Sequence, residues 1–308
     1  MSRFWLPLAL AAALASCSTD EDTGGGGGGG TGTSPATPAA LKVNVNAIAF
    51  DGVTLQVNIS SLDSTPLLVT YTRDPSLDVG GYLAFRIQED ALDRLFIALA
   101  GESADGAVRA VTVGDGGQFN RYFAGGIYER DGDFLRPATG SGPGAGQVSY
   151  AGSYAAVTNV DVLRGGPTDV AIAVPGGTEP ALIPAQPARV SGDIFLNANF
   201  ADDSVNGAIV NRVIVDDGFS LDDVILVSTA IAADGSFFGG AEYNDANNTP
   251  IGSYGGLFGG VGANSVAGLV NLEEFEPAWQ NEREHGMFVL TMCGPNNALP
   301  ICSLVAGP

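Results

Sequence analysis

Histidine and lysine are almost missing from this sequence. Its 308 residues include one histidine, His285, and one lysine, Lys42. A site that needs two imidazoles is therefore excluded, and most routes to Schiff-base chemistry or a lysine-lined anion pocket are removed. Only 13 basic side chains stand against 34 acidic ones, which gives a formal charge of −21. This balance disfavours nucleic-acid binding, which needs a basic surface against the phosphates.

The first seventeen residues carry the pattern of a bacterial lipoprotein signal. Arg3 precedes an apolar run over 4–15, which has the length of a signal-peptide core and is too short to span a bilayer as a helix. The run ends in Leu14-Ala15-Ser16-Cys17, so we expect residues 1–16 to be removed and Cys17 to be acylated. The alternative is an ordinary secretory signal that happens to contain a cysteine. Ser18, where an Asp would favour the inner membrane, predicts the outer membrane.

Residues 17–40 predict a lipidated cysteine followed by a flexible tether. Seven consecutive glycines lie among Thr, Ser, Pro and Ala, and such a segment cannot bury a core. Its mean reach is about 25 Å. Loss of Arg3 leaves a mature charge of 12 − 34 = −22. An anionic surface would repel this charge, so the lipid must hold the protein at the membrane.

Glycine is abundant, with 44 residues and no collagen-like period, so the rest of the chain is rich in turns. The run 137–146 contains mostly Gly, Pro, Ala and Ser, and we place a linker there between a domain at 41–136 and one at 147–308. Before the linker, β-prone runs alternate with Asp-Gly turns and predict a meander. The predicted strands are 41–50, 53–59, 66–72, 82–88, 94–100, 107–113 and 119–129. Apolar residues over 91–99 also fit one short helix.

After the linker, eight candidate strands indicate an antiparallel up-and-down β-barrel. The predicted strands are 148–158, 190–200, 205–215, 224–232, 236–243, 253–260, 265–272 and 287–293. In the second, apolar residues from Val190 to Phe200 share one face and polar residues the other. Glycines near the strand centres favour sharp bending and closure, with an interior that is filled by side chains or holds one small ligand. The alternative is a membrane barrel, which the polar face argues against.

Residues 147–293 resemble the barrel domain of transferrin-binding protein B, a family of surface lipoproteins of Gram-negative bacteria. The most specific stretch runs from Tyr254 to Leu269 and is similar to the family's penultimate hairpin. Its matching residues are Tyr254, Gly256, Phe258, Gly259, Ala263 and Gly268. The segments 150–154, 192–200 and 231–240 are similar to other barrel strands of the family. The resemblance implies that residues 41–136 form the smaller β-rich handle that precedes each barrel.

The sequence departs from the family in three ways. The hairpin's Gly-Pro is Gly259-Gly260 here, its Glu is Ser265, and the chain has one lobe of handle and barrel where the family has two. The matching positions are scaffold glycines and aromatics, which do not identify a partner. The resemblance therefore implies a fold and a location, and leaves the ligand open.

Cys293 and Cys302 are the two remaining cysteines, and outside the cytoplasm we expect them to form a disulfide. The alternative, a redox-active pair, has closer spacing in its usual Cys-x-x-Cys form. His285 could ligate a metal or haem with a second donor such as a tyrosine, Met287, Glu282 or Glu284, but a solvated turn histidine is the more common case.

No pattern in the sequence indicates catalysis or a cofactor. The acidic pairs at 131–133, 202–203 and 222–223 do not match a calcium loop. Ser141 and Ser153 lack the Gly-x-Ser-x-Gly form of a nucleophile elbow. We therefore expect neither enzymatic activity nor a bound metal.

The segment 164–188 contains five prolines and is long for a barrel connection. One interpretation is a partner-contact loop at a barrel mouth, and the other is a mobile insertion. The candidate contact residues are Arg164, Thr168, Asp169, Glu179 and Gln186.

Three functional hypotheses follow. The first is an outer-membrane, surface-displayed lipoprotein that binds a protein partner or an iron or haem carrier without catalysis, and whose acidic surface favours a basic partner patch. The second is a structural or assembly lipoprotein that faces the periplasm. The third is a carrier that holds a small ligand inside the barrel.

Overall fold

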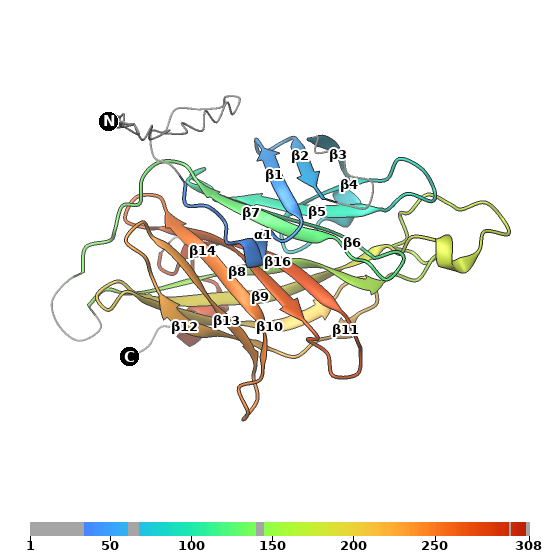
Figure 1. Cartoon of the computed structure of the whole chain (residues 1–308). Helices are drawn as coiled ribbons and strands as arrows, with labels where there is room; N and C mark the ends of the chain where they lie inside the picture. Colours follow the sequence, from blue (N-terminus) through green and yellow to red (C-terminus); the bar gives the residue numbers. More distant parts are fainter. Residues whose placement is uncertain (1–33, 61–67, 140–144, 296, 306–308) are drawn as a thin grey trace, which may run out of the picture.

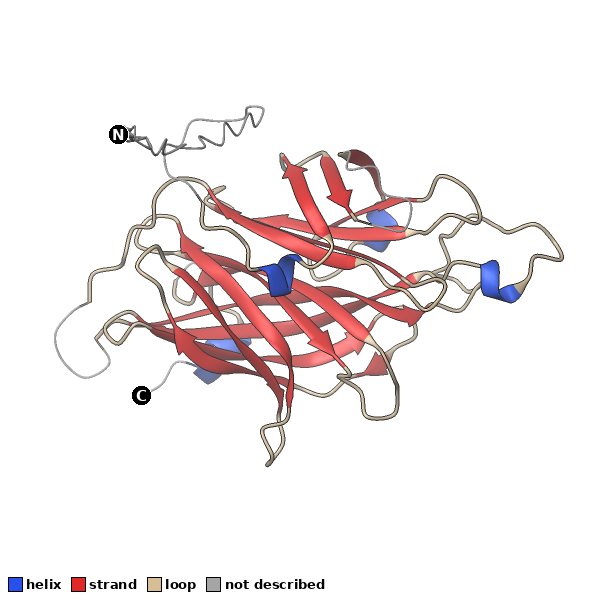
Figure 2. Ribbon diagram, viewed as in Figure 1, coloured by secondary structure: helices blue, strands red, loops and turns tan. Residues whose placement is uncertain are grey.

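The computed structural model describes residues 34–60, 68–139, 145–295 and 297–305. Strands form two antiparallel sheets that follow one another along the chain, as Figures 1 and 2 show. The described helices are short: α1 (Ala39–Lys42), η1 (Pro75–Leu77), η2 (Pro180–Leu182) and α2 (Pro300–Val305). The signal peptide, Cys17 and most of the tether lie outside the described residues, so those predictions are untested. No described helix is long and apolar enough to cross a membrane.

The first sheet, which we call the handle, is a meander of seven strands. They are β1 (Val45–Phe50), β2 (Leu55–Ile59), β3 (Val69–Arg73), β4 (Leu83–Ile87), β5 (Phe96–Glu102), β6 (Val108–Asp115) and β7 (Ala124–Arg130). The predicted Asp-Gly turns place Gly52 and Gly106 at φ of 87° and 70°, which glycine adopts without a steric penalty. Asn44 N donates to Ala124 O, so the two ends of the sheet approach each other.

The alternative helix over 91–99 is wrong, because residues 91–95 form no helix and residues 96–99 belong to β5. Leu95, Ile97 and Leu99 face the core between the handle and the second sheet, whereas Phe96 and Ala98 face the interior of the handle. Both faces of this strand are therefore buried. A continuous apolar run results, and it also contains the spacing of a helix.

The second sheet closes into the predicted eight-stranded antiparallel barrel. Its strands are β8 (Gln147–Asp161), β9 (Pro187–Asn199), β10 (Ser204–Ile214), β12 (Val224–Ala230), β13 (Ser236–Tyr243), β14 (Pro250–Gly259), β15 (Ser265–Glu273) and β16 (Arg283–Met292). Closure occurs because β8 pairs with both β9 and β16. The short β11 (Phe219–Ser220) pairs with the end of β10. The predicted linker falls between β7 and β8, but independent folding of the two parts remains a prediction.

Large aromatic side chains fill the barrel interior. Phe258 lies within 5.3 Å, ring centre to ring centre, of Tyr150, Phe200 and Phe237. Gly268 makes room for this packing, because a Cβ there would lie 2.3 Å from the ring of Phe288. Over the described strands, the barrel interior is therefore filled by side chains and does not form a cavity for a small ligand.

The residues of the hairpin motif have structural roles in the barrel. Tyr254 and Phe258 are completely buried, and Gly256 pairs with Gly268 across β14 and β15. Ala263 is buried in the turn that follows Gly259, with a φ of 55°. These positions therefore explain why the hairpin folds as it does and contribute no contact surface.

The handle packs tightly against the barrel wall. The two parts share one apolar core, which includes Leu99 and Val108 from the handle and Val157 and Met287 from the barrel. The hydroxyl of Tyr82 donates to Ser153 O at 2.7 Å and accepts from Val289 N at 2.9 Å. A handle side chain thus completes the hydrogen bonds between β8 and β16.

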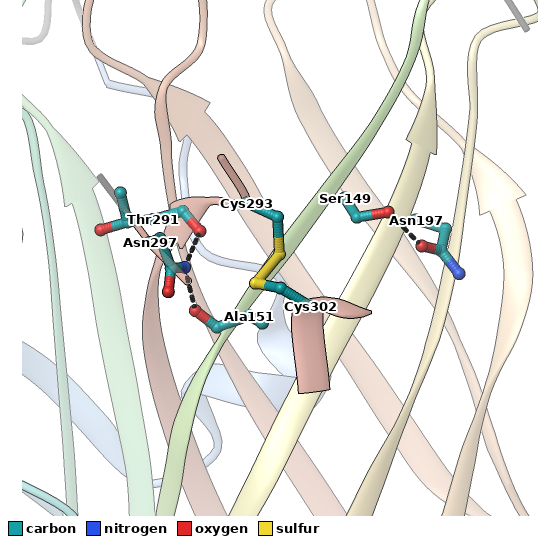
Figure 3. Close-up of a disulfide and its surroundings, with 7 residues drawn as sticks. All are labelled: Ser149, Ala151, Asn197, Thr291, Cys293, Asn297 and Cys302. Carbon is teal, nitrogen blue, oxygen red and sulfur yellow. Dashed lines mark hydrogen bonds between the residues drawn. A yellow bond between two sulfur atoms is a disulfide. The ribbon is translucent and has the colours of Figure 1, made fainter. Parts of the chain in front are cut away.

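The predicted disulfide between Cys293 and Cys302 is present and joins the end of β16 to α2, as Figure 3 shows. Nearby, the Asn297 side-chain amide donates to Ala151 O and Thr291 O at 3.0 and 2.8 Å. Cys293 N donates to Ser149 O on β8 at 2.8 Å. The bridge therefore holds the C-terminal segment against the barrel.

Replacing both Cys293 and Cys302 with serine should lower the free energy of unfolding by roughly 2.5–3 kcal/mol, because the open loop regains chain entropy in the unfolded state. Urea denaturation of the variant and the wild type measures the difference. In the same preparations, alkylation and mass spectrometry should find no free thiol in the unreduced wild type. Two labelled thiols would contradict the assignment.

Candidate functional site

Six loops gather at one end of the molecule, which we call the loop end. The handle contributes 88–95 and 116–123, and the barrel contributes 162–186, 215–223, 244–249 and 274–282. Strand direction explains the grouping, since consecutive antiparallel strands place alternate connections at the same end. In Figure 1 the loop 162–186 extends furthest, at the right of the view.

The loop 162–186, which joins β8 to β9, is bound to the handle rather than free. Four hydrogen bonds connect it to β4 and to the two handle loops. They are Arg86 Nη1 to Val170 O at 3.0 Å, Ile172 N to Gln88 Oε1 at 2.8 Å, Ala185 N to Gly117 O at 3.1 Å, and Gln118 Nε2 to Leu182 O at 2.8 Å. The loop end is thus one surface built from both parts of the molecule.

The predicted contact residues in this loop separate into two groups. Gln186 is completely buried, and its side chain binds Val170 N at 2.7 Å and Thr168 O at 2.8 Å. The interpretation of Gln186 as a surface contact is therefore wrong, because its amide is used to hold the loop. Arg164 and Asp169 pair with each other at 3.5 Å.

Glu179 is exposed near the tip of the loop. It is therefore the predicted residue whose charge is fully available to a partner. Thr168 is half-buried and takes part in the loop's own hydrogen bonding through its carbonyl.

Seven exposed apolar side chains lie in the described loops of the loop end. They are Leu92 and Phe119 from the handle, and Leu163, Ile172, Leu182, Val215 and Phe219 from the barrel. Side chains of this kind, brought together from separate loops, mark protein interaction sites. The length and the prolines of 164–188 pointed to one barrel loop, and no sequence pattern indicated the share of the handle.

Phe119 is the most unusual of these residues. It is 56% exposed, and with Asn120 it forms the two central positions of the tight turn between β6 and β7, both at a φ of 55°. Asn tolerates this left-handed conformation, whereas an aromatic residue is strained there by about 1 kcal/mol. Strained residues cluster at functional sites. The sequence pattern placed Phe119 at the start of the predicted strand 119–129, whereas the strand begins at Ala124, so this turn was missed.

Replacing Phe119 with asparagine should stabilise the protein by about 0.5–1 kcal/mol, because Asn is better suited to a positive φ and no core contact is lost. Thermal or urea unfolding measures the change. A destabilised variant would show that the phenyl ring contributes to folding, and would remove the argument that it is kept for binding.

Acidic groups surround the exposed apolar side chains. The exposed carboxylates include Glu89, Asp90, Asp93, Glu179, Asp222 and Asp245. Most arginines at this end already pair with carboxylates, as Arg94 does with Asp115 and Arg189 with Asp216. In the described part of the loop end, Arg121 alone among the arginines has no ion pair. The free charge of this surface is therefore strongly negative.

A buried ionic network lies inside the barrel below these loops. Arg212 Nη2 binds Glu284 Oε2 at 2.7 Å, and the hydroxyl of Tyr154 binds Glu284 Oε1 at 2.6 Å. Arg212 and Glu284 are 1% and 0% exposed. Burial, followed by the charge of Glu284, raises the pKa of Tyr154 well above its ordinary value, so this phenol stays neutral and donates.

His285 is not the solvated turn residue that the sequence suggested. It lies within β16, is 3% exposed, and its ring centre is 6.0 Å from that of Tyr122 on the handle. The strand starts at Arg283, four residues before the predicted start, so His285 belongs to the strand and not to the turn before it. Its side chain faces the handle. No cluster of three or more metal-ligating residues occurs in the described parts of the chain.

Stability should fall with acidification through His285. Burial, with a smaller contribution from Arg283, lowers the pKa of His285 to about 3, whereas its ordinary value is 6.5. Below pH 6.5 the unfolded chain binds a proton that the folded chain does not, so stability is lost as the pH falls toward 3. Between pH 6 and 4, replacing His285 with glutamine should reduce the slope of the unfolding free energy with pH. The reduction should be up to about 1.4 kcal/mol per pH unit. Parallel curves for the two proteins would contradict the assignment.

Comparison with known proteins returns matches among solved structures alone, since no protein-family model and no curated protein sequence matches the chain. The chain is similar to an intact two-lobed transferrin-binding protein B, Ap-TbpB, with 14% identity and a TM-score of 0.37 over 74% of this chain and 40% of that one. For the protein of Haemophilus parasuis Hp5, in a double-mutant form, the identity is 12%, the TM-score 0.35 and the coverage 78% and 51%. For the isotype 1 protein of Neisseria meningitidis serogroup B, the identity is 13% and the TM-score 0.34. The match covers 79% of this chain and 50% of that one. The chain thus spans about half or less of these proteins, which bear the name of the family that its barrel motifs resemble.

Proposed function

We propose that the protein is an outer-membrane, surface-displayed lipoprotein that binds a protein partner or an iron or haem carrier through its loop end, without catalysis. The observation that carries the proposal is that handle and barrel loops which hydrogen bonds hold together both carry exposed apolar side chains. A preformed surface of this kind loses little conformational entropy on binding. The transferrin-binding proteins named above bind transferrin, and the family resemblance of the sequence supports a similar class of role here.

The position of the tether supports presentation of the loop end away from the membrane. The first described residue, Ser34, accepts a hydrogen bond from Arg130 N through its hydroxyl at 3.0 Å. Arg130 ends β7 at the end of the handle opposite the turn that contains Phe119. A lipid on Cys17 would therefore hold the molecule from the end opposite the proposed binding surface.

The filled lumen favours surface binding over the alternative of a carrier. Tyr150, Tyr154, Tyr254, Phe258 and Phe288 are completely buried inside the barrel. A small ligand in the interior would have to displace these rings, at a large cost in packing. The second alternative, a structural lipoprotein that faces the periplasm, is separated from the proposal by location.

Protease treatment of intact cells tests the location. We expect cleavage in exposed loops of the full-length lipoprotein, while a periplasmic control stays intact. Protection of the protein on cells whose known surface proteins are cleaved would favour the periplasmic alternative.

Capture of a partner from growth medium tests the binding surface. The bait is the full-length lipoprotein in detergent micelles, compared with a Phe119→Asn and a Val261→Ser variant. Val261 is a matched control, because it is 82% exposed and lies in the β14–β15 turn at the opposite end. We expect Phe119→Asn to reduce capture at least tenfold and Val261→Ser to leave it unchanged. Equal capture by all three proteins would exclude the loop end as the binding surface.

A further inference from the structure

A pocket of about 490 Å³ opens in the loop end between the start of β12, the β13–β14 hairpin and the loop 274–282. Its walls include three carboxylates, Asp222, Asp223 and Asp245, together with Tyr243 and Pro277. The hairpin wall is held in shape, because Asp245 accepts hydrogen bonds from Asn247 N at 3.0 Å and Thr249 N at 3.2 Å. In the described part of the chain, neither Asp222 nor Asp223 takes part in an ion pair.

A further carboxylate, buried and incompletely bonded, belongs to the loop 274–282, which forms one wall of this pocket. Glu282 is 4% exposed, and its Oε2 has no hydrogen-bond partner among the described residues. Its Oε1 accepts from Glu276 N, beside the pocket residue Pro277, at 2.9 Å. Burial, followed by the charges of Glu276 and Glu282, raises the pKa of the pocket residue Tyr243 to about 12. The negative field of Glu282 therefore acts in the pocket.

Two arginines in the described part of the chain lie near the pocket, and both pair with carboxylates that do not line it. The charge of Arg212 opposes those of Glu276 and Glu282 at Tyr243, and it is the smaller influence. Arg212 binds Glu284 through Nη2 and the carbonyl of Asp222 through Nη1, both at 2.7 Å. Arg283 pairs with Glu273 at 2.8 Å. The three aspartates that line the pocket are thus left without an ion pair among the described residues, and its net charge is negative.

An aromatic pair lies close along the chain to two residues of the pocket wall. Phe219 lies two residues before the pocket residue Leu221, and Trp279 lies two residues after Pro277. Their ring centres are 5.0 Å apart, and Phe219 is 41% exposed. Aromatic faces attract cations, and a planar guanidinium can also stack on them.

We propose that this pocket binds the guanidinium of an arginine side chain presented by the protein partner. Asp222 and Asp223 supply oxygens for charge-assisted hydrogen bonds, Glu282 supplies a fixed negative field behind them, and Phe219 with Trp279 supplies an aromatic face. Arginine fits this set better than lysine, because its fork of donors is planar and its charge is more weakly hydrated. The inference rests on the proposed binding function and names the partner chemistry for one part of the same surface.

The test uses the fluorescence of Trp279, which is the only tryptophan left after removal of residues 1–16. The full-length lipoprotein in detergent micelles is titrated with the blocked pentapeptide Gly-Gly-Arg-Gly-Gly and with its lysine counterpart at low salt. We expect the arginine peptide to bind at least threefold more tightly. Combining Asp222→Asn with Asp223→Asn should weaken its binding at least tenfold. The matched control combines Asp131→Asn with Asp133→Asn, which removes the same charge at the opposite end and should weaken binding less than twofold.

Three results would overturn the proposal. The first is an equal loss of peptide affinity in both double variants, which would mean attraction by net charge alone. The second is displacement of the peptide by calcium chloride, which would mean a metal site. The third is the absence of any fluorescence change with the arginine peptide. The broader function is tested separately. If the Asp222→Asn, Asp223→Asn variant captured the partner normally while Phe119→Asn did not, the loop end would remain the binding surface and the arginine pocket alone would be wrong.

Discussion

Replacing Glu284 with glutamine should destabilise the protein by about 3–5 kcal/mol, the expected cost of removing one partner of a buried ion pair. The charge of Arg212, which is 1% exposed, would remain inside the barrel without a counter-charge. The neutral amide also cannot accept from both Arg212 and Tyr154 in the way the carboxylate does. Urea denaturation of the variant and the wild type measures the loss.

The matched control is Glu273→Gln, which breaks the pair of Glu273 with Arg283 on the surface. Both side chains of that pair are nearly half exposed, so the expected loss is under about 1 kcal/mol. A variant in which Arg212→Met and Glu284→Leu are combined should recover much of the stability, because neither charge is then left alone. Equal effects of Glu284→Gln and Glu273→Gln would show that water reaches the buried pair.

Replacing Tyr82 with phenylalanine should cost about 2–4 kcal/mol, although the ring stays in place. The Tyr82 hydroxyl is the partner of both Val289 N and Ser153 O, at the place where the pairing of β8 with β16 is interrupted. Without it, a buried donor and a buried acceptor both lose their hydrogen bonds, and each loss costs about 1–3 kcal/mol. Gly101 keeps this position open, because a Cβ there would lie 2.4 Å from the Tyr82 ring.

Hydrogen exchange gives a local measurement of the same effect, since the amide of Val289 should exchange faster in the Tyr82→Phe variant. Tyr243→Phe serves as the control, because the Tyr243 hydroxyl donates to Glu274 O at a more exposed position and its loss should cost under about 1 kcal/mol. Unchanged protection of Val289 would mean that another group closes the gap between β8 and β16.

Local sequence patterns predicted most of the strands. Asp-Gly turns, alternation in the strand that contains Ile194, and glycines such as Gly268 are short-range signals, because each reflects the conformation of a few neighbouring residues. They failed where a residue's surroundings come from elsewhere in the chain. The strand Phe96–Glu102 is buried on both faces, and His285 is covered by the handle, so neither has the local pattern of its actual environment.

The candidate site was predicted less completely than the fold. The loop that contains Arg164 and Glu179 was identified by its length and its prolines, but Gln186 was assigned to the surface although it holds the loop from inside. The contribution of Phe119 was missed. Its loop and the barrel loop are separated in the chain by all of β7 and β8, and hydrogen bonds between handle and barrel bring the two together.

The sequence by itself determined an all-β chain with turn-rich strands, a strongly acidic surface and a cysteine pair near the C-terminus. These properties depend on composition and on spacing within a few residues. Only the tertiary structure decided that aromatic rings fill the barrel, that Arg212 is buried beside Glu284, and that handle and barrel loops form one surface. Those outcomes depend on contacts between residues far apart in the chain, which no local pattern encodes.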